Sequence, residues 1–276
     1  MKDYLEMTEI EVAQLVWIHS NKFTIPELFR KKFFPQMTYR NTCYLLNKYA
    51  RPEKGFLHSE KPTQTSNTYY YLTAGAIRTL DAMDRLLVRS TKYPIKINPY
   101  EREHDMKVQE VRIAFEAKPD LGGVFWVSDF EMRSGITPAV KARFQAGELD
   151  KGRWRSSWSD GRNKSRRTPD GYFEADVDGQ RMAFAFEFEN KPRSDGKIQD
   201  MVSYLNYSFP EATKMVVSAI EKNAIRMIRA LQVKIKKSEQ EKWFVSDFDK
   251  ATTLPFKEIW FRLDHPLGGE GEIPQE

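Results

Sequence analysis

The chain has 276 residues, of which 40% are hydrophobic and 13% aromatic, a composition that excludes a disordered protein. Its 44 Lys and Arg residues face 39 Asp and Glu residues, so the net charge of +5 indicates nucleic-acid binding only if the cations are clustered. No apolar run approaches the roughly 20 residues of a membrane span, and the charged N-terminus lacks a signal peptide's apolar stretch. We therefore expect a cytoplasmic protein that does not bind membranes.

The sequence contains one cysteine, Cys43, which cannot form an internal disulfide and so fits a reducing compartment. It lies among apolar neighbours in a predicted helix, where a small core residue is expected. Cysteine and histidine do not recur at zinc-binding spacing, so a zinc site is not expected.

Three helices are predicted in the first fifty residues, each from a start signal. Thr8 and Glu11 form a capping box for a helix over 8–20. Thr24 with Pro26 starts a second helix over 24–33. Thr38 starts a third helix over 38–50.

Two short β-type runs follow, at 55–58 and 68–72. Three helices and then a two-stranded ribbon is the winged-helix order, in which the third helix enters the major groove of DNA and the ribbon flanks it. A protein-interaction module is the alternative, and the polar side chains of the third helix favour DNA. The candidate DNA contacts are Arg40, Asn41, Asn47 and Lys48 on this helix and Lys54, His58 and Lys61 on the ribbon.

A helix over 74–89 and a proline-containing linker over 92–99 complete the first part. We expect a DNA-binding domain over 1–91, a second domain over 92–267, and a disordered tail over 268–276. The second domain begins with a helix over 99–118, on which His104 shares a face with apolar residues. His104 is therefore either a packing residue or a possible site residue.

A hairpin in the second domain is the most informative pattern. Asp178-Gly179 joins β-type runs at 172–177 and 180–188, as a type I′ turn requires. The turn sets the register, which places Asp170 opposite Glu187 with Cβ atoms about 5 Å apart. Glu189 follows on the same face, because side chains alternate along a strand. Three carboxylates so close together need a compensating charge, and Mg²⁺ or Mn²⁺ prefers such oxygen ligands. The alternative is a solvated strand end, neutralised by Lys191, Arg193 or Lys197.

These residues resemble the PD-(D/E)XK nuclease superfamily, through Pro169-Asp170 and then Glu187-Phe188-Glu189 or Glu189-Asn190-Lys191. The resemblance implies that Asp170 and Glu187 bind the metal ion, with Glu189 as a further ligand. Lys191 keeps the spacing if Glu189 is the second acid, whereas Lys197, from the next helix, serves if Glu187 and Glu189 are the pair. Which lysine is catalytic stays open.

Most of the chain also resembles the replication-relaxation family of plasmids and integrative elements. The similar segments are Tyr70-Tyr71-Leu72-Thr73, His104-Asp105-Met106-Lys107-Val108, Pro169-Asp170-Gly171, and Glu187-Phe188-Glu189 followed by Lys197 and Tyr204. The match implies a winged helix joined to a restriction-endonuclease-like domain, and a role in replication or mobilisation of a mobile genetic element.

An irregular basic segment over 133–168 interrupts the second domain. Its cations suit phosphates and its tryptophans suit stacking on unpaired bases, so it is a further candidate for DNA contact. A solvated loop whose tryptophans pack on the domain is the alternative. The candidate residues are Arg153, Trp154, Arg155, Trp158, Lys164, Arg166 and Arg167.

The rest of the chain predicts a strand over 214–220, a helix over 221–236 and a strand over 243–246, which implies a parallel crossover, with a last strand over 258–262. The expected fold is α+β or α/β with a mixed sheet. We expect a DNA-binding protein of a mobile element, acting as a Mg²⁺-dependent endonuclease in replication, mobilisation or transposition, with proteins of those processes as partners. The alternatives are a catalytically inactive accessory factor and a winged-helix transcription regulator.

Overall fold

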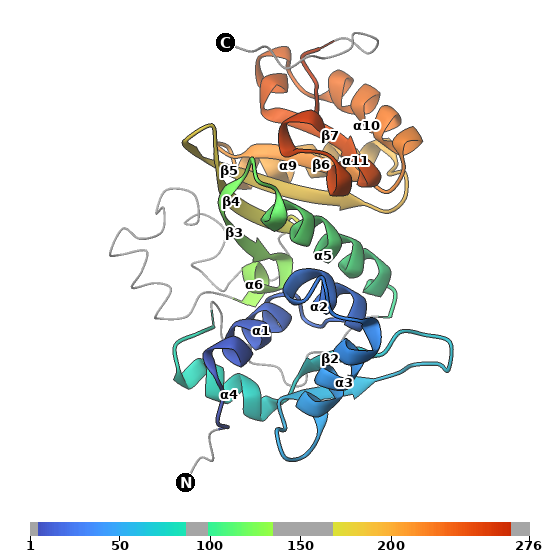
Figure 1. Cartoon of the computed structure of the whole chain (residues 1–276). Helices are drawn as coiled ribbons and strands as arrows, with labels where there is room; N and C mark the ends of the chain where they lie inside the picture. The colour runs from blue at the N-terminus through green and yellow to red at the C-terminus, as the bar shows by residue number, and fades with distance from the viewer. Residues whose placement is uncertain (1–4, 87–98, 135–167, 266–276) are drawn as a thin grey trace. The chain divides into compact units, whose positions relative to one another are not determined.

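The computed structural model describes residues 5–86, 99–134 and 168–265, which form a mixed α and β fold (Figure 1). The chain divides into two compact units, one of residues 1–109 with 130–151 and the other of residues 110–129 with 152–276. This division falls within a helix, whereas the sequence placed the boundary at 91/92. Most of the predicted linker, the interior of the basic segment and the whole predicted tail lie outside the described residues.

The first unit begins with the three expected helices, each starting one or two residues after its predicted first residue. Thr8 lies outside its helix, and its hydroxyl accepts a hydrogen bond from the Glu11 amide at 3.3 Å, which confirms the capping box. The Thr38 hydroxyl likewise accepts from the Asn41 amide at 3.2 Å. The helices are α1 (Glu9–Ser20), α2 (Pro26–Phe33) and α3 (Tyr39–Ala50).

An antiparallel ribbon of β1 (Leu57–Glu60) and β2 (Tyr69–Leu72) packs beside α3. The ribbon starts two residues later than predicted, because Gly55 has a φ of 59° and is not extended. Next comes α4 (Ala74–Ala82), capped by Thr73. It is shorter than the predicted helix, since Asp84, at a φ of 53°, has left the helical conformation.

The second unit is built on a six-stranded mixed sheet whose spatial order is β3-β4-β5-β6-β7-β8. The pairs β5–β6 and β6–β7 are parallel and the other three pairs are antiparallel, so the predicted parallel crossover is confirmed. The strands are β3 (Gly122–Ser128), β4 (Gly171–Val177), β5 (Gln180–Glu189), β6 (Thr213–Ser218), β7 (Trp243–Asp247) and β8 (Phe261–Arg262).

The predicted hairpin is the β4–β5 pair, and its register is confirmed. Val177 pairs with Gln180, and the pairing continues to Gly171 opposite Phe186. Asp178 and Gly179 have φ values of 52° and 76°, the left-handed conformations that a type I′ turn needs at both central positions. A local turn signal therefore fixed which side chains share a face of this hairpin.

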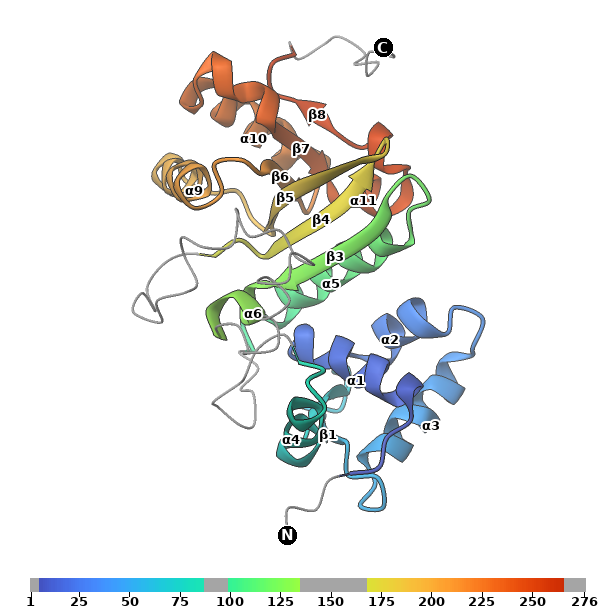
Figure 2. The same ribbon diagram turned by 90° about the vertical axis from the view of Figure 1, so that its left-hand side faces the viewer.

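The two faces of the sheet are covered differently, because side chains alternate along each strand. On one face Phe173 and Phe186 contact Phe115 of α5 (Arg102–Ala117), with ring centroids 5.6 and 6.2 Å away. On the other face the Tyr172 ring stacks on Phe209, directly after α9 (Asp195–Ser208). The helix α10 (Glu221–Lys234) packs against α9 (Figure 2).

The end of the second unit differs from the prediction. The strand expected over 258–262 is reduced to β8, because Pro255 starts a turn of 3-10 helix, η2 (Phe256–Glu258). Two short elements precede η2: η1 (Lys237–Lys242), which lies between α10 and β7, and α11 (Phe248–Thr253), which follows β7. A short helix, α6 (Asp129–Ser134), follows β3. Within the described ranges, no helix combines the length and apolar character needed to cross a membrane.

Candidate nucleic-acid interface and acidic cluster

The helix α3 has one buried face and one exposed polar face. Thr42, Leu46 and Tyr49 are buried at helical spacing. The remaining positions present two cations, two amides and two phenols, and the sequence of α3 contains no Asp or Glu. We call this the α3 face; its residues are Tyr39, Arg40, Asn41, Tyr44, Asn47 and Lys48, all exposed.

Two contacts organise the α3 face. The Tyr70 hydroxyl of β2 donates to Asn47 Oδ1 at 2.8 Å, so the ribbon orients this amide. Burial raises the pKa of Tyr70 to about 12, which keeps the phenol a neutral donor at physiological pH. The Arg51 guanidinium lies 5.9 Å from the centroid of the Tyr44 ring. Tyr39 and Tyr44 were not among the contacts predicted from the sequence, although their spacing opposite the buried face was a usable signal.

The predicted ribbon cations have different environments. Lys54 Nζ lies 2.9 Å from Glu11 Oε1 and 5.1 Å from the centroid of the Phe56 ring. Its charge is therefore paired within the first unit. His58 and Lys61 are exposed, and the ring of His58 packs on Tyr71. Of the three, Lys61 and His58 keep the exposure that a DNA contact requires.

His104 lies half-buried in the first turn of α5. It belongs to the first unit, whereas the predicted acids belong to the second unit. The predicted DNA contacts of the basic segment, at positions 153, 154, 155, 158, 164, 166 and 167, lie outside the described residues.

The predicted acids of the second unit lie together at the end of β5. Glu187 and Glu189 share one face of the strand and are both buried, with 3% and 5% of their surface exposed. Asp170, half-buried, precedes β4, and its Oδ2 accepts a hydrogen bond from the Phe188 amide at 2.8 Å. The structure therefore brings Asp170 beside the two glutamates, as the hairpin register predicted.

Arg193 is the cation that contacts both glutamates. Its Nη2 lies 3.3 Å from Glu187 Oε2, and its Nε lies 2.5 Å from Glu189 Oε1. Burial lowers the pKa of Arg193, but the charges of Glu187, Glu189 and Asp170 outweigh this effect and raise the pKa overall. From the sequence, Arg193 was predicted only as one of three possible neutralising cations. The two predicted catalytic lysines, Lys191 and Lys197, are exposed.

A row of polar side chains crosses the carboxyl ends of the three parallel strands. Glu189 pairs in register with Ser218, and Ser218 with Asp247, so the three lie on one face of the sheet. Ser218 is fully buried, and among the described residues its hydroxyl has no hydrogen-bond partner. Asp247 accepts from the Lys250 amide at 3.0 Å and so caps α11. Sequence reasoning missed Ser218, because pairing between distant parallel strands has no local signal.

A divalent cation suits the chemistry of this donor set, which consists of oxygen atoms. The arrangement is less suitable. In the part of the chain that the structure describes, no three Asp, Glu, His or Cys side chains are close enough together to hold a metal ion. Because Arg193 bridges Glu187 and Glu189, the side chains as they stand do not fit a metal ion there.

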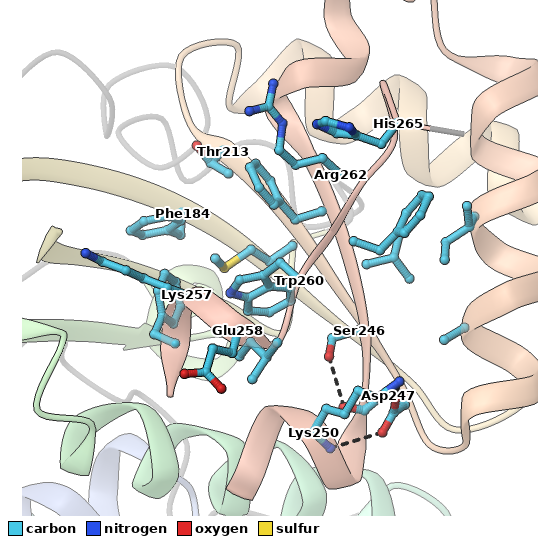
Figure 3. Close-up of a pocket in the computed structure, with 18 of the residues that line it drawn as sticks. Phe184, Thr213, Ser246, Asp247, Lys250, Lys257, Glu258, Trp260, Arg262 and His265 are labelled. Carbon is cyan, nitrogen blue, oxygen red and sulfur yellow. Dashed lines mark hydrogen bonds and ion pairs between the residues drawn. The ribbon is translucent and has the colours of Figure 1, made fainter. Parts of the chain in front are cut away.

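The second unit also contains a cavity of about 520 Å³, lined by apolar and polar residues of β5, β6, β7, α10 and the segment 256–265 (Figure 3). Trp260 and Phe184 form part of its wall. The cations at its edge are engaged with acids: Lys257 contacts Asp178, and Arg262 contacts Asp264. Among the described residues, no predicted site residue lines this cavity.

Comparison with known proteins found no matching family model, no matching curated protein and no matching solved structure. Arguments about function therefore depend on the residues themselves.

Proposed function

We propose that the chain is a DNA-binding protein that contacts the duplex with the α3 face. The order of three helices, an antiparallel ribbon and a further helix supports a winged-helix assignment. In that arrangement the third helix reads the major groove and the ribbon reaches the adjacent backbone.

The observation that carries the proposal is the composition of the α3 face. Arg40 and Lys48 are exposed cations that can neutralise phosphates, which supply most of the affinity of DNA-binding proteins. The amides of Asn41 and Asn47 can pair with base edges, as amides do with adenine. With no acid on α3, nothing on this helix repels the phosphate backbone.

Lys61 extends the interface to the ribbon. It is exposed, and the sequence from Lys61 to Asn67 contains no acid. The proposed biological role is in replication, mobilisation or transposition of a mobile genetic element, with other proteins of those processes as partners. This role rests on the family resemblance of the sequence.

Titration of the protein with random-sequence duplex DNA over a series of salt concentrations tests DNA binding. Since binding to phosphates releases counterions, the logarithm of the affinity should fall linearly with the logarithm of the salt concentration, by about 0.9 for each phosphate contacted. Absence of binding at low salt, or an affinity that salt does not change, would contradict the proposal.

A second candidate function is DNA cleavage by a PD-(D/E)XK-type site in the second unit. It is favoured by the hydrogen bond that holds Asp170 beside the strand of Glu187 and Glu189. Cleavage would need Mg²⁺ or Mn²⁺, with Lys191 or Lys197 as the predicted phosphate-binding cation. The alternative is that the unit serves as a platform without cleaving.

Incubation with supercoiled and single-stranded DNA in Mg²⁺ or Mn²⁺ separates these two cases. Nicking that is lost in both Asp170→Ala and Glu187→Ala would establish the nuclease. Binding without cleavage under every condition would establish the platform.

A further inference from the structure

The acidic cluster carries more negative charge than a buried site tolerates without a counter-ion. Glu187 and Glu189 are nearly inaccessible to water, and their side chains are on the same face of β5. Two like charges so close repel each other and destabilise the fold unless a cation lies between them. A divalent metal ion is one such cation.

Arg193 supplies a cation of this kind from the chain itself. It uses two different nitrogen atoms, Nη2 for Glu187 and Nε for Glu189, so one planar group serves both carboxylates. The side chain is only 24% exposed, which limits competition from water and salt. A guanidinium stays protonated at all physiological pH values, so this counter-ion is permanent.

The chain holds Arg193 in place from its own backbone. Arg193 lies four residues after Glu189 and directly before Ser194, the residue that precedes α9. The strand β5 and the helix α9 therefore fix both ends of the segment that carries it. Lys191, on the same segment, is exposed, so charge alone does not draw a cation of this segment inward.

We propose that Arg193 replaces the divalent cation as the counter-ion of Glu187 and Glu189, so that the second unit keeps its acid pair without a metal ion. The inference concerns the second unit alone, does not depend on DNA binding by the α3 face, and is opposed to the metal-dependent cleavage given above as the second candidate function. It predicts that the site gains affinity for a divalent cation only when Arg193 is removed. The buried Ser218 hydroxyl, next to Glu189 in register and without a partner among the described residues, then offers a third oxygen ligand.

Thermal unfolding of the full chain with EDTA, or with millimolar Mg²⁺ or Mn²⁺, tests the proposal without DNA. The wild-type melting temperature should be the same in all three conditions. Arg193→Ala should melt lower in EDTA by on the order of 10 °C, because it removes the cation that contacts both buried carboxylates. Mn²⁺ should restore part of this loss in Arg193→Ala, and titration calorimetry should detect Mn²⁺ binding to this variant and not to the wild type.

Three control variants separate charge compensation from packing. Lys191→Ala removes an exposed cation of the same segment and should melt at the wild-type temperature in all three conditions. Arg193→Lys should keep part of the stability, because it retains one charge. Glu187→Gln with Glu189→Gln and Arg193→Ala removes all three charges, and Mn²⁺ should not stabilise it. If Arg193→Ala does not fold, this triple variant and Arg193→Lys still test the proposal.

Two results would overturn the proposal. One is stabilisation of the wild type by Mn²⁺ that is lost in Glu187→Gln, since a metal ion would then bind with Arg193 present. The other is an Arg193→Ala variant that melts in EDTA at the wild-type temperature, since Arg193 would then not be the counter-ion of the acid pair.

Discussion

The α3 face and the Glu187–Glu189 pair use similar residues in opposite ways. On α3, Arg40 and Lys48 are exposed and no acid of the same helix accompanies them, so their charges are available to a phosphate. At the end of β5, Arg193 is mostly buried and contacts two carboxylates, so its charge is neutralised within the fold. Burial and neighbouring charge, rather than residue type, decide whether a cation recognises a ligand or stabilises the protein.

The largest effect is expected where the acidic cluster meets the sheet. Gly171 directly follows Asp170, and a Cβ atom at Gly171 would lie 2.3 Å from the buried Trp126 ring. Gly171→Ala should therefore lower the free energy of unfolding by about 3 kcal/mol, because the indole must move. Urea unfolding measures this loss. Gly196→Ala is the matched control: its Cβ would contact nothing within 4 Å, so this helical site should become slightly more stable.

A buried titratable group in the first unit gives the next effect. Burial lowers the pKa of His19 to about 4, below an unfolded value of about 6.5. The unfolded state therefore binds more protons as the pH falls below about 6.5, and stability falls until the pH reaches the folded pKa near 4. Between pH 7 and pH 5 the loss should be about 2 kcal/mol, and His19→Gln should remove this dependence. Equal pH profiles for the two proteins would contradict the assignment.

The support of the α3 face should have a smaller effect. Tyr70→Phe removes the hydrogen bond to Asn47 Oδ1 and leaves the packing of the ring intact. The free energy of unfolding should fall by about 1 kcal/mol. Discrimination between DNA sequences should weaken more than affinity for random DNA, because the amide loses its fixed orientation. If the variant discriminates as well as the wild type, Asn47 does not read bases.

The smallest effect on stability is expected at the ribbon. Lys61→Ala alters an exposed side chain, so the free energy of unfolding should change by less than about 0.5 kcal/mol. The salt slope of DNA binding should nevertheless decrease by about one. A full wild-type slope would place the ribbon outside the interface.

Local signals in the sequence predicted the helices and strands, and they predicted that Asp170 lies beside Glu187 and Glu189. The capping residues Thr8 and Thr38 marked helix starts, and the Asp178-Gly179 turn fixed the register that brings Asp170 to the glutamates. The β6 and β7 neighbours of Glu189 could not be predicted, because parallel pairing joins residues far apart in the chain. The contacts of Arg193 with Glu187 and Glu189 depend on the rotamer and burial of Arg193, which no sequence spacing encodes.

The strand predicted over 258–262 shows a different limit. The apolar residues are present as predicted, but the first residue of the run belongs to the 3-10 turn η2, which follows Pro255. The residues in register with β7 are Phe261 and Arg262. A short apolar run at a sheet edge indicates burial more reliably than it indicates strand length.

The most direct test of DNA binding through the α3 face compares two variants in one salt titration with duplex DNA. Arg40→Ala with Lys48→Ala removes both exposed cations of the α3 face, whereas Arg78→Ala removes an exposed cation from α4. We expect the double variant to bind more weakly and to lose about two units of salt slope, while Arg78→Ala keeps the wild-type affinity and slope. A double variant with unchanged affinity and slope would show that α3 does not contact DNA.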